Sequence, residues 1–215
     1  MLSKNSKSSV LWFFIFLPYL LVIAGIFYYL KKVEEIKNSS FVIINKADMT
    51  LSLYDYTGNL LQKSEVATGK VFGDKKVKGD LKTPEGVFSV IDIQDASNWT
   101  HDFKDDTLGD IKGAYGPYFI RLGVPGQNGI GIHGTHDSSS IGTRASEGCI
   151  RMQNQEIRKL VPKIKQSTIV VIVPGIEDVK ENKADKDNLY RKSNESDNSI
   201  KKIIKKKRHK KIENI

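Results

Sequence analysis

The sequence predicts a mostly-β domain with one or two short helices, preceded by one transmembrane helix. Short runs rich in β-branched and aromatic residues recur between residues 41 and 174, with Gly, Pro, Asn or Asp between them. One later segment has apolar residues at helical spacing. An uncharged run of 21 residues lies near the N-terminus, and a lysine-rich segment follows the domain.

The uncharged run, Val10–Leu30, is predicted to be a membrane anchor, joined to the domain by a linker over residues 31–40. At 1.5 Å per residue it forms about 31 Å of helix, close to the roughly 30 Å hydrocarbon core of a bilayer. A cleaved signal peptide is the alternative. Its apolar region spans only about 7–15 residues before small cleavage-site residues, whereas Phe27–Leu30 are large. Lysines flank the run on both sides, so the positive-inside rule does not decide its orientation.

The domain is predicted to span residues 41–174. Its clearest helix begins at Asn154, the expected N-cap, and carries Ile157, Leu160 and Ile164 on one face. Pro162 is expected to shorten that helix. The predicted strands are Phe41–Asn45, Leu51–Tyr54, Leu60–Val66, Val87–Ile93, Tyr118–Leu122, Ile130–His133 and Thr168–Val173.

Residues 175–215 are predicted to be a basic, disordered tail. Eight of the twelve residues from Ile200 to Lys211 are Lys or Arg. Such a segment has too little apolar surface to offset the entropy of ordering it. A second interpretation is an electrostatic tether to anionic lipid or polymer, worth about 1 kcal/mol per basic residue near a membrane.

The charge distribution argues against a nucleic-acid-binding core. The net charge of +9 divides into +3 over residues 1–37, +1 over residues 38–175 and +5 over residues 176–215. The middle of the chain is therefore balanced, and only its ends are basic. One cysteine in the chain excludes an intramolecular disulfide framework and a multi-cysteine zinc site.

The chemistry-bearing residues are concentrated in Ile130–Met152. A short apolar run ends at His133, and Gly134–Thr135 then predict a turn that exposes the imidazole at a strand end. Cys149 follows 16 positions after His133. A thiol becomes a strong nucleophile as the thiolate, which needs a nearby base or positive charge. His133 is the predicted base.

The residues around Cys149 favour a reactive thiol. A lone cysteine is more often a buried apolar residue, and a lone histidine is more often structural. Here Arg144 and Arg151 add positive potential, whereas Glu147 opposes it if its side chain points towards the sulfur. The backbone amides around Gly148 and Cys149 are candidate donors to a developing oxyanion.

Other polar residues are expected to be structural or solvated. His136 is expected at the mouth of the site or in solvent, Ser138–Ser140 in a flexible loop, and Gly123–Gly129 in a turn. No Lys-Ser/Thr ending follows those glycines, so they do not predict a phosphate-binding loop. His101 and the acidic residues between 102 and 110 are expected to form a solvated insertion rather than a cation site.

Four motifs in this order resemble the L,D-transpeptidase catalytic domain, the YkuD-like family. That family has an HGT-type segment followed by Ser/Thr-x-Gly-Cys-x-Arg/Asn, matched here by His133–Thr135 and Ser146–Met152. Upstream, Ala67–Lys70 and Lys82–Phe88 resemble its TGK and TPEG stretches. The resemblance covers about residues 41–174, the whole predicted domain.

The resemblance implies a β-sandwich-like fold, a cysteine nucleophile at Cys149 and a catalytic base at His133. Many members of the family have His where this chain has Glu147, so a change in donor preference or rate is implied. The other implied site residues are Gly134, Ser146 and Gly148, which shape the site or its oxyanion donors, and Thr135, Arg144, Glu147 and Arg151, which bind substrate.

The resemblance further implies peptidoglycan stem peptides as substrates and 3→3 cross-linking through a thioester, in cell-wall organisation and cell shape. No metal, cofactor or nucleic acid is expected. A wall substrate places the domain outside the bacterial cytoplasmic membrane, facing the periplasm or cell wall, with residues 1–9 in the cytoplasm. The alternatives are an L,D-carboxypeptidase or exchange enzyme, a protein-to-wall attachment enzyme, and a catalytically decayed, membrane-tethered wall-binding module.

Overall fold

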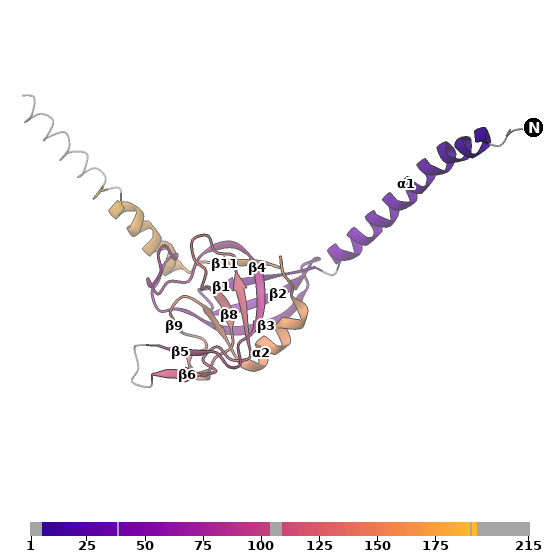
Figure 1. Ribbon diagram of the computed structural model, residues 1–215. Helices are drawn as coiled ribbons and strands as arrows, with labels where there is room; N and C mark the ends of the chain where they lie inside the picture. Colours follow the sequence, from indigo (N-terminus) through magenta and orange to yellow (C-terminus); the bar gives the residue numbers. More distant parts are fainter. Residues whose placement is uncertain (1–5, 38, 104–108, 190, 193–215) are drawn as a thin grey trace, which may run out of the picture.

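The domain is built around a closed β-barrel (Figure 1). In this computed structural model, residues 6–37, 39–103, 109–189 and 191–192 are described, with side chains from residue 16 onward. Nine strands form one sheet in the order β10-β8-β7-β4-β11-β1-β2-β3-β9, and β10 also pairs with β3. Eight of these strands therefore close into a ring, and β9 pairs with β3 beside it.

The strands are β1 (Ser40–Asn45), β2 (Thr50–Asp55), β3 (Leu60–Gly69), β4 (Gly86–Asp95), β5 (Thr100–Asp102), β6 (Asp110–Lys112), β7 (Tyr118–Leu122), β8 (Gly131–His133), β9 (Arg144–Ser146), β10 (Ile150–Met152) and β11 (Ile169–Val173). The helices are α1 (Ser6–Lys37), α2 (Asn154–Leu160), the 3-10 turns η1 (Ser138–Ser140) and η2 (Val161–Lys163), and a C-terminal helix over residues 176–189.

The sandwich-like expectation is wrong, although the predicted strands are present. The strand β10 pairs with both β8 and β3, which closes the sheet on itself instead of leaving two facing sheets. With α2 and the C-terminal helix added, the fold is mixed α/β rather than mostly β. Alternate residues of the strands fill the core, as Val42 and Ile44 do in β1.

The helix α2 packs on this core through Ile157 and Leu160. It ends at Leu160, where Pro162 falls in the 3-10 turn η2, so the predicted shortening is confirmed. The predicted N-cap is wrong. Gln153 occupies the N-cap without a side-chain cap, and the side chain of Asn154 is used elsewhere, as described below.

The N-terminal helix α1 projects away from the barrel (Figure 1). Its segment Phe16–Lys37 has a mean hydropathy of 1.5, is not buried, and is long and apolar enough to cross a membrane. A signal sequence near the N-terminus has the same properties. The predicted anchor over residues 10–30 therefore stays a prediction.

The C-terminal helix differs from the predicted disordered tail. Asp178 is fully buried and bonds two cations, with 3.0 Å to Lys46 Nζ and 2.7 Å to Arg144 Nη2. Its carboxylate also accepts hydrogen bonds from the amides of Gly73 and Gly175. Buried polar contacts, rather than an apolar stripe, attach this helix to the barrel. The lysine-rich end of the predicted tail, residues 193–215, lies outside the described residues.

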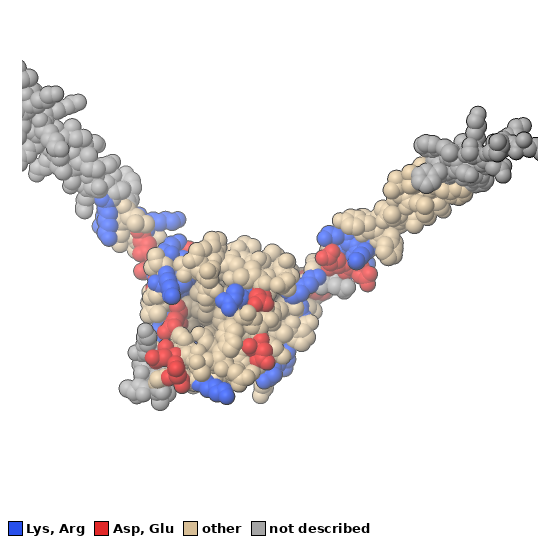
Figure 2. All heavy atoms as spheres, viewed as in Figure 1, with Lys and Arg blue, Asp and Glu red and all other residues tan. Residues whose placement is uncertain are grey.

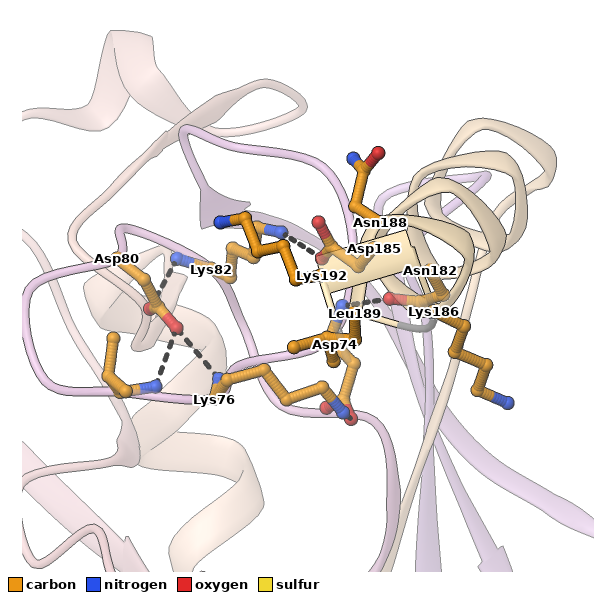
Figure 3. A pocket seen from close by; sticks show the side chains of 11 residues that line it. Asp74, Lys76, Asp80, Lys82, Asn182, Asp185, Lys186, Asn188, Leu189 and Lys192 are labelled. Atoms are coloured by element: carbon orange, nitrogen blue, oxygen red, sulfur yellow. Dashed lines mark hydrogen bonds and ion pairs between the residues drawn. The ribbon is translucent and has the colours of Figure 1, made fainter. Parts of the chain in front are cut away.

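Figure 3 shows a hollow between the C-terminal helix and the loop over residues 74–82. It has a volume of about 730 Å³ and is closed on one side by the ion pair between Lys82 and Asp185, 3.0 Å long. Cys149 and His133 are not among its lining residues, so the hollow is separate from the predicted site. On the face drawn in Figure 2, basic and acidic side chains are scattered among uncharged ones.

Candidate active site

The parallel pairing of β8 with β10 brings the two predicted catalytic segments together. His133 pairs with Arg151, and Ile132 pairs with Ile150. Alternate residues of a strand face the same side, and both isoleucines are fully buried in the barrel core. His133 and Arg151 therefore share the opposite face, where Cys149 precedes β10 and lies opposite Gly131 of β8.

His133 is held by its own loop and by two aromatic rings. Its Nδ1 lies 2.5 Å from the carbonyl oxygen of Gly134. Because a carbonyl only accepts hydrogen bonds, Nδ1 carries the proton and Nε2 keeps its lone pair. Phe119 stacks on the imidazole with ring centroids 5.6 Å apart, and Tyr115 meets it edge-on at 4.8 Å.

Burial lowers the pKa of His133 to about 3. The hydrogen bond to the Gly134 carbonyl raises this pKa and the charge of Arg151 lowers it, both by less than burial does. The side chain is 2% exposed. The imidazole is consequently neutral at physiological pH. Its Nε2 has no hydrogen-bond partner among the described residues, which suits the predicted role of general base.

Cys149 is partly exposed at the end of the same face. Its thiol donates to the carbonyl oxygen of Gly129, with 3.2 Å between Sγ and the oxygen, and the amide of Gly131 donates to the sulfur. Both glycines flank Ile130, where the chain enters β8. The thiol is thus fixed by the backbone that leads into His133.

The resting thiol is protonated, contrary to the expectation that nearby cations create a thiolate. Desolvation raises the pKa of Cys149 to about 11 and outweighs the Gly131 amide and the charges of Lys75 and Arg151, while Glu147 raises the pKa further. With His133 neutral, the site holds a thiol and an imidazole that are both uncharged.

The hydroxyl of Ser146 makes two hydrogen bonds within the turn before Cys149. The Ser146 hydroxyl donates to the carbonyl oxygen of Cys149 at 2.5 Å and accepts from the amide of Gly148 at 3.1 Å. The amide of Gly148 is therefore engaged and is not a free oxyanion donor as predicted. The amide of Cys149 remains the candidate donor in this turn.

Thr83, from the TPEG stretch, joins this turn to the end of β3. Its hydroxyl accepts from the amide of Gly69 at 2.8 Å and donates to the carbonyl oxygen of Gly148 at 3.0 Å. At Gly148, φ is +134°, and an added Cβ would lie 2.8 Å from the carbonyl oxygen of Lys82. Glycine is required at this position on both grounds.

Gly134 and Thr135 form the loop after His133, and Asn154 holds it. The Asn154 side chain accepts from the Thr135 amide and donates to the Thr135 carbonyl, both at 2.9 Å. A Cβ on Gly134 would lie 2.2 Å from Asn154 Oδ1, so the site-shaping role predicted for Gly134 fits this packing. The Thr135 hydroxyl bonds Asp137 inside the loop, which does not support its predicted role in substrate binding.

Arg144 is not brought together with the thiol. Its guanidinium bonds Asp178 at 2.7 Å and lies over the ring of Phe72, 4.0 Å from the centroid. These contacts hold it under the C-terminal helix. The predicted contribution of Arg144 to the thiol and to substrate binding is therefore not supported by its position.

Arg151 and Glu147 lie at the site with capacity to bind. Arg151 is 6% exposed, and its guanidinium lies over Phe103, 4.8 Å from the ring centroid. Within the described ranges it makes no ion pair with a carboxylate. Glu147 is partly exposed and contacts His101 of β5 at 3.1 Å. His101 therefore belongs to the rim of the site, contrary to the expected solvated insertion.

The structure adds residues that the sequence did not assign to the site. Tyr115 and Phe119 pack on His133, Lys75 acts on the thiol, and Asn154 braces the histidine loop. None of these four residues lies in the four motifs that carry the family resemblance. Thr83, which joins the turn before Cys149 to β3, does lie in one of them, the TPEG stretch. Over the described part of the chain, no group of three or more His, Cys, Asp or Glu side chains is arranged to hold a metal ion.

The structure is thus a closed barrel with His133 at the end of β8 and Cys149 directly before β10, the strand that pairs in parallel with β8. The family model for the YkuD L,D-transpeptidase catalytic domain matches residues 39–172. The chain belongs to this family.

Two relatives illustrate the extent of the similarity. "Putative L,D-transpeptidase YqjB" of Bacillus subtilis (strain 168) is 34% identical over 134 residues, which are 61% of this chain and 70% of the relative. "Putative L,D-transpeptidase YkuD" of Bacillus licheniformis is 30% identical over 125 residues. That match is 58% of this chain and spans 60% of the relative's length.

Solved structures are more distantly similar. The catalytic domain of the Enterococcus faecium L,D-transpeptidase has 18% identity and a TM-score of 0.47, covering 63% of this chain and 98% of that one. The helical cell shape determining protein Pgp2 of Campylobacter jejuni has 25% identity and a TM-score of 0.46, covering 63% and 48%. At such TM-scores these likenesses add nothing to the functional assignment.

Proposed function

We propose that this protein is a peptidoglycan L,D-transpeptidase that forms 3→3 cross-links through a thioester on Cys149. The observation that carries the proposal is the register of β8 and β10, which places His133 and Arg151 on one face beside Cys149. Family membership supports the same chemistry. Arg151, a mostly buried cation without a carboxylate partner among the described residues, suits a carboxylate of the donor stem.

In the first step, the thiol of Cys149 attacks the carbonyl carbon at the L-centre of the third stem residue. Nε2 of His133 takes the thiol proton as the carbon–sulfur bond forms, because neither group is charged beforehand. The amide of Cys149 is the candidate donor to the developing oxyanion. The imidazolium then gives its proton to the departing amine of the terminal D-residue, and the thioester remains.

In the second step, an amine from a neighbouring stem attacks the thioester carbonyl. The carbon–nitrogen bond forms, the carbon–sulfur bond breaks, and His133 passes the proton lost by the amine to the sulfur. One amide replaces another, so the acyl transfer needs no nucleotide. Water in place of the amine gives a carboxypeptidase, and an amine on a protein gives attachment to the wall.

The same proposal includes a location. Residues 10–30 would span the bacterial cytoplasmic membrane once, with residues 1–9 in the cytoplasm and the barrel facing the periplasm or cell wall. The length and hydropathy of the N-terminal helix support this arrangement. The lysine-rich residues after 192 would contact anionic lipid or wall polymer.

The test is incubation of the full chain in detergent with disaccharide-tetrapeptide muropeptides, followed by mass spectrometry, with Cys149→Ala as the matched variant. Dimers joined through their third stem residues are expected from the wild type and not from Cys149→Ala. Tripeptide monomers alone would assign a carboxypeptidase. Absence of both a product and a thioester would contradict the catalytic proposal and favour a wall-binding module.

A further inference from the structure

A chain of two hydrogen bonds reaches the site from the β5–β6 hairpin. The Tyr115 hydroxyl lies 3.1 Å from His101 Nδ1, and His101 Nε2 lies 3.1 Å from Glu147 Oε2. The ring of Tyr115 packs edge-on against His133 at the other end. Many members of the family have histidine at the position of Glu147. In this chain Glu147 is instead held by a histidine from a distant segment, His101.

The direction of these hydrogen bonds leaves part of Glu147 available. Burial raises the pKa of Tyr115 to about 12, and the charges of Cys149 and Glu147 raise it to a smaller extent. The phenol therefore keeps its proton. The Tyr115 hydroxyl therefore donates its hydrogen bond to His101 Nδ1, and His101 Nε2 donates to Glu147 Oε2. The second oxygen, Oε1, accepts no hydrogen bond from the described residues, and the side chain is 43% exposed.

The charges around the thiol explain why such a carboxylate is useful. Arg151 and Lys75 both act on Cys149 as nearby cations. Lys75 is paired with Asp80 at 2.7 Å, so Arg151 is the cation that suits a carboxylate of the donor stem. The acceptor arrives as an ammonium group, which the same two cations repel. Glu147 acts on Cys149 with the opposite sign and lies two residues from it in the chain. An ammonium group is therefore attracted to the Glu147 side of the thiol.

We propose that Glu147, positioned by His101 and Tyr115, forms the acceptor subsite and binds the ammonium group of the incoming stem peptide. The inference rests on the proposed transpeptidase function and assigns its specificity for the second substrate. The bound ammonium loses one proton to water, its nitrogen attacks the thioester carbonyl, and the carbon–sulfur bond breaks. His133 transfers the second nitrogen-bound proton to the departing sulfur.

The experiment measures how the thioester divides between competing nucleophiles. The full chain in detergent is given a tetrapeptide donor with either a diamino stem tripeptide, whose side-chain amine is an ammonium ion, or hydroxylamine, which is neutral near pH 7. For Glu147→Gln, the ratio of cross-linked to hydrolysed product is expected to fall about tenfold with the tripeptide, because a charge-assisted hydrogen bond is lost. With hydroxylamine, the ratio of the product of its attack on the thioester to the hydrolysed product is expected to be unchanged.

Three further variants make the result specific. Glu147→Asp is expected to restore part of the tripeptide ratio, and Tyr115→Phe, which keeps the ring against His133, to lower it less than Glu147→Gln does. Glu177→Gln, on the exposed side of the C-terminal helix, is the matched control and is expected to behave as wild type.

Each outcome has one meaning. An unchanged tripeptide ratio in Glu147→Gln, or equal losses with both nucleophiles, would overturn the acceptor assignment. Slower release of the donor's terminal residue in that variant would instead assign Glu147 to the donor step, which also overturns it. A wild type that forms no thioester would refute the proposed function itself, and that result is visible before any acceptor is added.

Discussion

Two clusters of charge in this molecule use similar residues in opposite ways. Under the C-terminal helix, Lys46 and Arg144 both bond Asp178, and Lys46 also bonds Glu85 at 2.7 Å. Lys46 and Asp178 are fully buried. Each charge in this cluster has an opposite charge within contact distance, and the cluster joins the start of the barrel to its last helix.

At the thiol, two of the charges are not matched in this way. Arg151 has an aromatic ring rather than a carboxylate beside it, and Glu147 keeps one oxygen without a donor from the described residues. Removing one member of a closed cluster is destabilising because it strands the others. An open cluster has interactions left for a substrate. The difference separates the residues that hold the barrel from those assigned to the proposed reaction.

The largest expected effect breaks the closed cluster. Asp178→Asn should lower the free energy of unfolding by about 3–5 kcal/mol, since it leaves two cations without their shared carboxylate. Urea unfolding of the full chain in detergent, followed by fluorescence, measures this loss. Asp187→Asn, exposed on the same helix, should change the free energy of unfolding by less than about 0.5 kcal/mol. Equal effects of the two substitutions would contradict the assigned role of Asp178.

The second prediction concerns the neutral imidazole at the open cluster. Since the pKa of His133 is about 3 in the folded chain and near 6.5 when exposed, the unfolded chain binds more protons between these values. Stability is therefore full above pH 6.5 and is lost as pH falls towards 3. From pH 7 to 4.5 the contribution of His133 should be a loss of roughly 2–3 kcal/mol.

His133→Gln removes that contribution, so its own loss of stability over the same pH interval should be smaller by this amount. Unfolding of both proteins at the two pH values provides the comparison. An identical loss in wild type and variant would show that His133 is not held in its neutral form.

The smallest effects come from exchanging the two arginines for methionine. Arg151→Met should lower kcat/KM for thioester formation about 10- to 100-fold through loss of charge-assisted hydrogen bonds to the donor, with little change in stability. Arg144→Met should do the reverse and cost about 1–3 kcal/mol of stability, because Asp178 loses a partner. The test measures, for both variants, kcat/KM for donor acylation and the free energy of unfolding in urea. If Arg144→Met impaired acylation without loss of stability, the separation of the two clusters would be wrong.

The sequence was sufficient to single out His133 and Cys149 as the candidate pair and to predict the longer strands. His133 and Cys149 could be found because their neighbours are unusual for structural residues. The short strands β9 and β10 could not, since three residues are too few to show alternation. Their pairing, which sets the face shared by His133 and Arg151, depends on long-range register.

The C-terminal helix was missed for a different reason. Its attachment depends on Asp178, Asn182 and Asp185, whose contacts are polar, so no apolar periodicity predicts it. A charge-rich segment of this kind has the composition of a disordered one. Likewise, His101, Tyr115 and Glu147 come from three separate segments, and only folding shows that they are neighbours.

Barrel closure also determines when the site comes into existence. The first strand, β1, pairs with the last, β11, and β10 pairs with both β8 and β3. Contacts between segments so far apart in the chain form late, because they require closure of long loops. A growing or translocating chain that has not reached Val173 lacks a closed ring, and its cysteine is then an ordinary thiol. The proposed reactivity is therefore expected only once the domain is complete.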